Sequence, residues 1–469
     1  MKSISRRALS LYLIIILFLA GCGLLFYNLV SNSSDWAMNR ANQHLYASGN
    51  LATAGDITDV NGNILATTKD GKRIYSDSKN VRLATLHTVG DSAGFIASGI
   101  QTSFKDELTG YTLVDGVYNL KRYGKGNDIK LTLNSDVCAA AYKALGNKKG
   151  TVGVMNYKTG ELVCVVSTPT YDIKNKPDDI DTDTTDKYEG IYMNRFFSGL
   201  YTPGSTFKVI TAACAIENIP DIYSRTFECE GKILIGEGYV ICNGTHGKID
   251  FETAMNESCN CAFAKIADEL GGEKLTLTAE RLGFNTKKMT VSDKIGCAKS
   301  KFDLSGSKPL DIGWAGIGQY TTLINPCQML TIISAIANGG IANNPYIVSE
   351  ITNPEGNVVF TEKTSEMGEL FTSSVAQSLD NILRSNVKNE YGDWRFPNLN
   401  MCGKTGTAEI SDDEDAKPNA LFVGYSQNEE TPFAIIVVVE NATSAIQSAV
   451  PVATAVMNEI NKQYKLKTP

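Results

Sequence analysis

Residues 200–216 read LYTPGSTFKVITAACAI, in which a turn-forming Pro-Gly pair is followed by a long apolar run. Ser205 comes directly after the turn, and Lys208 follows three residues later. Residues 209–216 are apolar apart from one threonine, so the pattern predicts a buried helix that begins near the serine. The stretch raises one question: whether the serine and the lysine are a nucleophile and its base, or only the start of a core helix.

The spacing of Ser205 and Lys208 suits a proton transfer. Residues three apart on a helix have Cβ atoms about 5–6 Å apart, which lets the hydroxyl and the amine form a hydrogen bond. Burial and the positive end of the helix dipole both disfavour an ammonium ion, so we expect the pKa of Lys208 to be lowered. A desolvated lysine can replace histidine as a base. Taken alone, the pattern also fits a serine N-cap and a lysine that reaches solvent, because Ser-x-x-Lys occurs four times here.

Two further motifs favour the catalytic interpretation. The triplet SCN, 258–260, lies where a loop is expected to enter a helix, and KTGT, 404–407, lies on a late strand. A second KTG, 158–160, occupies the tight turn of an early hairpin, where turn chemistry explains it. Ser-x-x-Lys, Ser-x-Asn and Lys-Thr-Gly in this order form the motif set of β-lactamases and penicillin-binding proteins.

An uncharged segment of 23 residues, 8–30, predicts a membrane-spanning helix near the N-terminus. At about 1.5 Å per residue it spans about 34 Å, enough to cross a bilayer. Lys2, Arg6 and Arg7 precede the segment and no Lys or Arg follows until Arg40. This charge bias predicts a cytoplasmic N-terminus, with the rest of the chain outside the membrane.

Two alternatives exist for this segment. A cleaved signal peptide has an apolar core of about 7–15 residues, which is shorter than the run found here. LAGC, 19–22, resembles a lipobox that would make Cys22 a lipidated N-terminus, but apolar residues continue to Val30. We therefore expect an uncleaved anchor, and lipidation of Cys22 stays open.

Strand and helix patterns predict an α+β chain in three parts: a tail and anchor (1–31), a small mixed α/β extracytoplasmic domain (32–146) and a larger domain (147–469). Two early strands and three late ones, with helical patterns between them, predict one mostly antiparallel sheet interrupted by a helical insertion and covered by helices on both faces. The predicted strands are 151–157, 161–167, 401–410, 420–426 and 433–440, and the predicted last helix is about 444–464.

Composition excludes several classes of function. The net charge of −7 gives no sequence-wide basic character, so a role in binding nucleic acid is not expected. Eleven cysteines make a full disulfide framework improbable, although Cys229 and Cys242 can pair outside the membrane. None of the three histidines has His or Cys neighbours at the usual metal-ligand spacing, and Cys259 and Cys261 are too close for a paired site. The acidic run 178–186 does not fit an EF-hand. We therefore expect no metal or cofactor.

The flanks of the motifs resemble class B penicillin-binding proteins, which are membrane-anchored peptidoglycan D,D-transpeptidases. The resemblance covers nearly the whole chain and departs from the family at Leu421, where members often carry Trp, and in the short domain before residue 147. The matching stretches are GDITDVNGNILATT (55–68), GNDIKLTLN (126–134), NRFFSGLYTPGSTFK (194–208), HGKIDFETAMNESCNCAFAKIA (246–267), GIGQYTTLINPCQML (316–330), CGKTGTAE (402–409) and NALFVGYS (419–426).

The resemblance implies the penicillin-recognising serine transferase fold and a role for each motif. Ser205 would attack a D-alanyl-D-alanine stem peptide, with Lys208 as the base and Ser258 relaying the proton to the leaving amine. Backbone N–H groups of Ser205 and Thr407 would form the oxyanion hole. The implied substrate-binding residues are Asn260, Lys404, Thr405, Gly406 and Thr407.

The resemblance also implies partners. Peptidoglycan stem peptides would be the substrates, β-lactams would acylate Ser205, and a SEDS-type glycan polymerase would bind the anchor and first domain. Alternatives that share the fold are a D,D-carboxypeptidase or a β-lactamase, in which water is the acceptor. A non-catalytic scaffold of the wall-synthesis complex is the alternative from another class.

Overall fold

A five-stranded antiparallel sheet forms the centre of the larger part of the chain. The fold is given by a computed structural model that describes residues 2–37, 46–47, 50–51, 53–113, 125–286, 289–409 and 417–465. The strand order is β19-β20-β21-β7-β8, which confirms the predicted sheet of two early and three late strands. Their bounds are β7 Gly150–Asn156, β8 Leu162–Thr168, β19 Met401–Ala408, β20 Asn419–Ser426 and β21 Phe433–Val439.

Helices pack on both faces of this sheet, which is why its central strands are apolar without alternation. On one face α14 packs with α6, and on the other α12 packs with α13. Asn325 caps α12 by accepting hydrogen bonds from the backbone N–H groups of Cys327 and Gln328. The bounds of the covering helices are α2 Lys79–Val89, α6 Ser135–Leu145, α7 Arg195–Ser198, α8 Lys208–Asn218, α12 Pro326–Ala337, α13 Ser373–Asn386 and α14 Ala445–Lys465.

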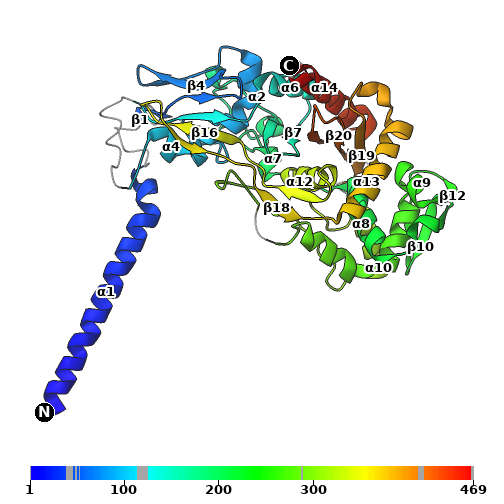
Figure 1. The fold of residues 1–469 in the computed structure, drawn as a ribbon, viewed down its shortest axis with the longest axis horizontal. Helices are drawn as coiled ribbons and strands as arrows, with labels where there is room; N and C mark the ends of the chain where they lie inside the picture. The colour runs from blue at the N-terminus through cyan, green and yellow to red at the C-terminus, as the bar shows by residue number, and fades with distance from the viewer. Residues whose placement is uncertain are drawn as a thin grey trace.

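The segment that separates the early and late strands in the sequence includes a lobe of helices and two pairs of short antiparallel strands, at the right of Figure 1. The sequence predicts its helices but not its strands, which are only four residues long and largely exposed. In this lobe β9 pairs with β12 and β10 pairs with β11. The bounds are β9 Thr226–Cys229, β10 Lys232–Ile235, β11 Gly238–Ile241, β12 Gly247–Asp250, α9 Phe251–Asn256, α10 Asn260–Arg281 and α11 Pro309–Gly316.

A second sheet of six strands, in the order β17-β16-β6-β3-β4-β5, joins segments far apart in the sequence. Strand β16 comes from the later part of the chain and pairs with β6, which precedes residue 146. The boundary between 32–146 and 147–469 stays a prediction, since this sheet takes strands from both sides. The bounds are β3 Ile57–Thr58, β4 Ile64–Lys69, β5 Lys72–Tyr75, β6 Asp128–Leu131, β16 Val348–Thr352 and β17 Val358–Thr361.

Short elements complete the described chain. They are β1 Tyr46–Ala47, β2 Asn50–Leu51, α3 Ile100–Ser103, α4 Lys105–Thr109, β13 Thr290–Val291, β14 Ile295–Gly296, β15 Ile341–Asn343, β18 Glu366–Glu369 and the π-helical turn η5 Val387–Tyr391, together with single 3₁₀ turns.

Helix α1, Lys2–Ala37, projects away from the rest of the chain (Figure 1). An 18-residue window within its stretch Arg6–Ser33 has a mean hydropathy of 2.6, and the stretch is long and apolar enough to cross a membrane. The helix packs on nothing along its apolar window, which agrees with the predicted single-pass anchor.

Candidate active site

The nucleophile turn differs from the helix start that the sequence predicts. Residues Gly204–Phe207 form a 3₁₀ turn, η3, and the α-helix begins only at Lys208. No side-chain cap bond is made at the start of either element, so Ser205 is not an N-cap. Its Oγ instead lies 3.1 Å from Lys208 Nζ. The alternative of a capping serine and a solvent-reaching lysine is therefore wrong.

Lys208 is completely buried and surrounded by oxygen atoms. Besides the serine, its Nζ donates to Ser258 O at 2.5 Å and to Asn260 Oδ1 at 2.7 Å, and lies 3.2 Å from Ser258 Oγ. Burial, and secondly the charge of nearby Lys404, hold the pKa of Lys208 well below its usual value. The neutral amine needed to accept a proton is thus favoured by the surroundings.

Lys404 enters the same site from β19. Its Nζ lies 3.0 Å from Ser258 Oγ and 3.2 Å from Thr405 O, and burial lowers the pKa of this amine to about 7. Ser258 Oγ therefore lies between two buried amines. Ser258 has a φ of 54°, a left-handed backbone that is uncommon for a residue other than glycine. Such strain persists only where the surroundings hold it in place.

Two glycines let β19 and the loop before α12 approach the nucleophile turn. A Cβ on Gly406 would lie 2.7 Å from Pro203 O, and one on Gly318 would lie 2.0 Å from Gly204 O. Gly318 also has a φ of 82° and accepts a hydrogen bond of 2.9 Å from Gly204 N. Ser205 is thus held between β19 and this loop by backbone contacts that a larger side chain would block.

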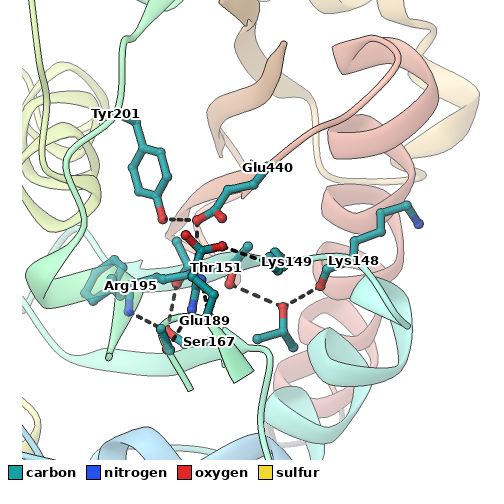
Figure 2. Close-up of polar contacts among 12 residues, drawn as sticks. Lys148, Lys149, Thr151, Ser167, Glu189, Arg195, Tyr201 and Glu440 are labelled. Carbon is teal, nitrogen blue, oxygen red and sulfur yellow. Dashed lines mark hydrogen bonds and ion pairs between the residues drawn. The ribbon is translucent and has the colours of Figure 1, made fainter. Parts of the chain in front are cut away.

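The segment before the nucleophile turn is tied to the end of β21. Arg195 Nε and Tyr201 OH each donate to Glu440 Oε1 at 2.8 Å, as Figure 2 shows. Arg195 N also donates to Ser167 Oγ at 2.9 Å, which links the segment to β8. The arginine is almost fully buried, so this ion pair is shielded from solvent. The network fixes the chain four residues before Ser205.

Tyr391 belongs to the site although no sequence motif indicates it. Its OH accepts hydrogen bonds from Thr405 N at 3.2 Å and from Thr405 Oγ1 at 3.0 Å, and lies 3.5 Å from Lys404 Nζ. It is buried at the end of η5, where burial raises the pKa of its phenol. Tyr391 therefore orients Thr405. A lone tyrosine 14 residues before its partner gives no signal in the sequence.

The predicted site residues converge on one cleft of about 910 Å³. Lys208 and Lys404 lie beneath it, fully buried. Thr407 Oγ1 accepts a hydrogen bond from Ala445 N at 3.3 Å. The oxyanion hole of backbone N–H groups stays a prediction. Residues that line the cleft include Ser205, Ser258, Asn260, Thr405 and Thr407.

A second cluster, of sulfur and imidazole, adjoins the cleft. Ligand atoms of Cys229, Cys242, His246 and Cys259 all lie within 4.8 Å of one another, and Cys242 also lines the cleft. From the sequence, Cys229 and Cys242 are predicted only as a possible disulfide pair, and neither the histidines nor Cys259 with Cys261 show the usual metal-ligand spacing. The missed signal is that Cys229 and Cys242 are 13 residues apart, as are His246 and Cys259. The paired strands of the lobe bring these four residues together.

Comparison with known proteins agrees with this geometry. The family model "Penicillin binding protein transpeptidase domain" matches residues 150–462. Peptidoglycan D,D-transpeptidase PbpA of Mycolicibacterium smegmatis is 24% identical over 75% of this chain and 76% of its own length. Stage V sporulation protein D of Bacillus subtilis is 28% identical over 71% of this chain and 53% of its own length.

Solved structures share the fold. The D,D-transpeptidase domain of a peptidoglycan glycosyltransferase from Eggerthella lenta aligns with a TM-score of 0.77 and 26% identity, covering 88% of this chain and 99% of that one. An acyl-enzyme complex of penicillin-binding protein A from M. tuberculosis aligns with a TM-score of 0.77 and 22% identity, covering 87% and 98%. The resemblance read from the motifs is confirmed, and the chain belongs to the penicillin-binding protein transpeptidase family.

Proposed function

We propose that this protein is a serine D,D-transpeptidase that cross-links peptidoglycan stem peptides through an acyl-enzyme and is inhibited by β-lactams. The observation that supports it most is a continuous chain of polar contacts beneath the cleft. Ser205 Oγ contacts Lys208 Nζ, which contacts Ser258 Oγ, which contacts Lys404 Nζ, at 3.1, 3.2 and 3.0 Å.

Acylation then follows from the positions of these groups. The neutral amine of Lys208 takes the proton of Ser205 Oγ as this oxygen attacks the carbonyl carbon of the penultimate D-alanine. Backbone N–H groups of Ser205 and Thr407 hold the resulting oxyanion. As the C–N bond breaks, Ser258 gives its proton to the leaving amine and regains one from Lys208. Free D-alanine departs and an ester on Ser205 remains.

Substrate binding uses the other side of the cleft. The ammonium of Lys404, with the hydroxyls of Thr405 and Thr407, suits the terminal carboxylate of the stem peptide or of a β-lactam. Asn260 lines the cleft and contacts Lys208 through its Oδ1, which leaves it beside the peptide backbone of a bound donor. The amine of a neighbouring stem then attacks the ester, releases Ser205 and forms the cross-link.

The charge pattern of the anchor supports a catalytic part outside the membrane, where peptidoglycan is assembled. Helix α1 carries basic residues at its start and an apolar stretch behind them, which favours a cytoplasmic N-terminus and an extracytoplasmic catalytic part. A SEDS-type glycan polymerase is the proposed membrane partner of α1 and of the sheet that follows it.

Penicillin labelling of the full-length protein in detergent tests the nucleophile. We expect one penicilloyl group by intact mass, mapped to the peptide that contains Ser205, and none on Ser205→Ala. Ser305→Ala is the matched control, because this exposed serine has the same Ser-x-x-Lys spacing. An adduct on another residue contradicts the assignment.

The fate of the acyl group separates the related activities. An adduct that persists for many minutes is expected of a transpeptidase, whereas hydrolysis within seconds indicates a β-lactamase. With a donor stem peptide and an amine acceptor, a transpeptidase forms the new amide. Release of D-alanine without transfer indicates a D,D-carboxypeptidase.

A further inference from the structure

We propose that Cys229, Cys242, His246 and Cys259 bind one Zn²⁺ ion, and that this ion fixes the start of α10 and with it the Ser-Cys-Asn motif. The four residues come from separate parts of the lobe. Cys229 ends β9, Cys242 follows β11, His246 precedes β12, and Cys259 is the N-cap of α10. One ion would therefore join both strand pairs of the lobe to the start of α10.

The distances fit a tetrahedral site. Zn–S bonds of about 2.3 Å and Zn–N bonds of about 2.0–2.1 Å place two sulfur ligands about 3.8 Å apart and a sulfur about 3.6 Å from a nitrogen. Here Cys242 Sγ lies 3.9 Å from Cys259 Sγ, and His246 Nδ1 lies 3.4 Å from Cys229 Sγ and 3.6 Å from Cys242 Sγ. Three of the six edges of the tetrahedron thus have nearly the ideal length.

Groups around the cluster suit thiolate and imidazole ligands. Asn260 N donates to Cys242 Sγ at 3.2 Å and Ala262 N donates to Cys259 Sγ at 3.4 Å, and such bonds stabilise a thiolate. The other ring nitrogen of His246, Nε2, lies 3.9 Å from Glu257 Oε2. A carboxylate beside the second nitrogen is the usual way a metal-bound histidine is oriented.

The chemistry of the donor set favours zinc over a disulfide. Three sulfurs and one imidazole in a tetrahedral arrangement are typical of structural Zn²⁺ sites. A bond between Cys229 and Cys242 would use two thiols and leave the buried Cys259 thiol and His246 Nδ1 facing it. All cysteines are free in the structure, so the four donors point to one shared ion.

The site is positioned to act on catalysis without touching the substrate. Cys259 lies between Ser258 and Asn260, the two motif residues that contact Lys208 Nζ. Asn260 is also held by its backbone bond to Cys242 Sγ and by its Nδ2, which donates to Ile241 O at 2.9 Å. A bound ion would restrain the strained backbone of Ser258 from the next residue. The four ligands are positioning residues.

Metal analysis of the full-length protein, purified without metal-affinity resin, tests the binding. We expect about one zinc per chain, and at least a ~10-fold lower content in Cys229→Ser and His246→Ala, neither of which belongs to the proposed catalytic machinery. Cys214→Ala is the control, since this buried thiol contacts the far end of α10 near Thr278. Wild-type protein that takes up no stoichiometric Zn²⁺ after reduction, or variants that keep it, overturns the proposal.

Thiol mapping gives a test that does not depend on the folding of variants. In wild-type protein, Cys229, Cys242 and Cys259 should resist alkylation by N-ethylmaleimide until a chelator is added. Peptides joined by a disulfide between Cys229 and Cys242 in the native chain would overturn the metal site.

The positioning effect rests on the proposed function and has its own readout. We expect chelator-treated protein to be acylated by benzylpenicillin at least ~10-fold more slowly, with the rate restored by Zn²⁺ alone. An unchanged rate in zinc-free protein overturns the positioning claim. If zinc-loaded protein is not acylated at all, the proposed function fails while the measured metal content still decides the site.

Discussion

At the scale of single residues, two lysine side chains are buried under one cleft, where the charge of Glu390 acts on Lys404 without forming an ion pair. In the part of the chain that the structure describes, neither Lys208 nor Lys404 forms an ion pair, and both contact Ser258 Oγ. Two ammonium groups this close repel each other, so the pair favours a single positive charge. In the proposed mechanism the reactive state has that charge on Lys404, which would bind the substrate carboxylate, and a neutral amine at Lys208, which would act as the base.

This arrangement predicts a bell-shaped pH dependence of acylation. As pH falls, Lys208 gains a proton and the base is lost. As pH rises past the pKa of about 7 of Lys404, the carboxylate loses its charged partner. The second-order rate constant for benzylpenicillin, followed by stopped-flow, should therefore fall on both sides, with apparent pKa values that belong to the pair.

Lys404→Arg provides the control for that profile. Arginine stays charged across the accessible range, so the alkaline limb should move upward while the acid limb remains. A flat profile, or the same alkaline limb in the variant, would rule out the shared-proton arrangement.

The site residues that the sequence predicts are those within short local motifs. Ser205 and Lys208 are three residues apart, and the motifs around Ser258 and Lys404 each contain their own turn or strand signal. The sequence did not predict that Tyr391 belongs to the site or that the cysteines cluster, because these residues and their partners meet only through tertiary folding. Spacing along the chain is informative only where one element carries both groups.

At the scale of elements, the strands of the central sheet are predictable and those of the lobe are not. β7, β8, β20 and β21 are buried along nearly their whole length, and β21 and most of β8 are continuous apolar runs, which gives a strong signal. The strands of the lobe are four residues long and largely exposed, so any alternation, as in β9, is too short to identify a strand. The 3₁₀ turn at Ser205 could not be predicted either, because its sequence is also compatible with the first turn of an α-helix.

The contact between β19 and the nucleophile turn depends on the missing side chain of Gly406. In Gly406→Ala the new methyl group would lie 2.7 Å from Pro203 O and 3.0 Å from Thr206 Cγ2, so β19 must move away from Ser205. We expect the acylation rate to fall ~100-fold, the size of losing one oxyanion donor, with the helical content unchanged by circular dichroism.

Gly272→Ala is the matched control for this substitution. Its added Cβ would meet Leu304 Cβ at 3.5 Å, an ordinary contact, within α10. An acylation rate in Gly406→Ala equal to that of Gly272→Ala would show that the close approach of β19 does not matter.

At the scale of the whole molecule, the described residues before and after 146 share one apolar core. Buried residues of β3 and β6 and those of the central sheet belong to the same cluster, and α2 packs on both α6 and β8. Local patterns predict each strand, but the pairing of β16 with β6 joins residues more than 200 positions apart. Such non-local pairing leaves no periodicity in the sequence, which is why the predicted boundary could not include it.

His87, on α2, couples this packing to pH. Its Nε2 lies 2.8 Å from Ile191 O, and burial lowers its pKa from 6.5 to about 4. Below pH 6.5 the unfolded chain therefore binds a proton that the folded chain does not, and stability falls with falling pH until about 4. We expect a loss of about 2 kcal/mol in the free energy of unfolding between pH 7 and pH 5, measured by urea denaturation.

His87→Gln is the control variant, because it keeps an amide donor and removes the titration. Its loss of unfolding free energy over this range should be smaller by that amount. Equal pH dependence in the two proteins would mean that His87 titrates alike when folded and unfolded.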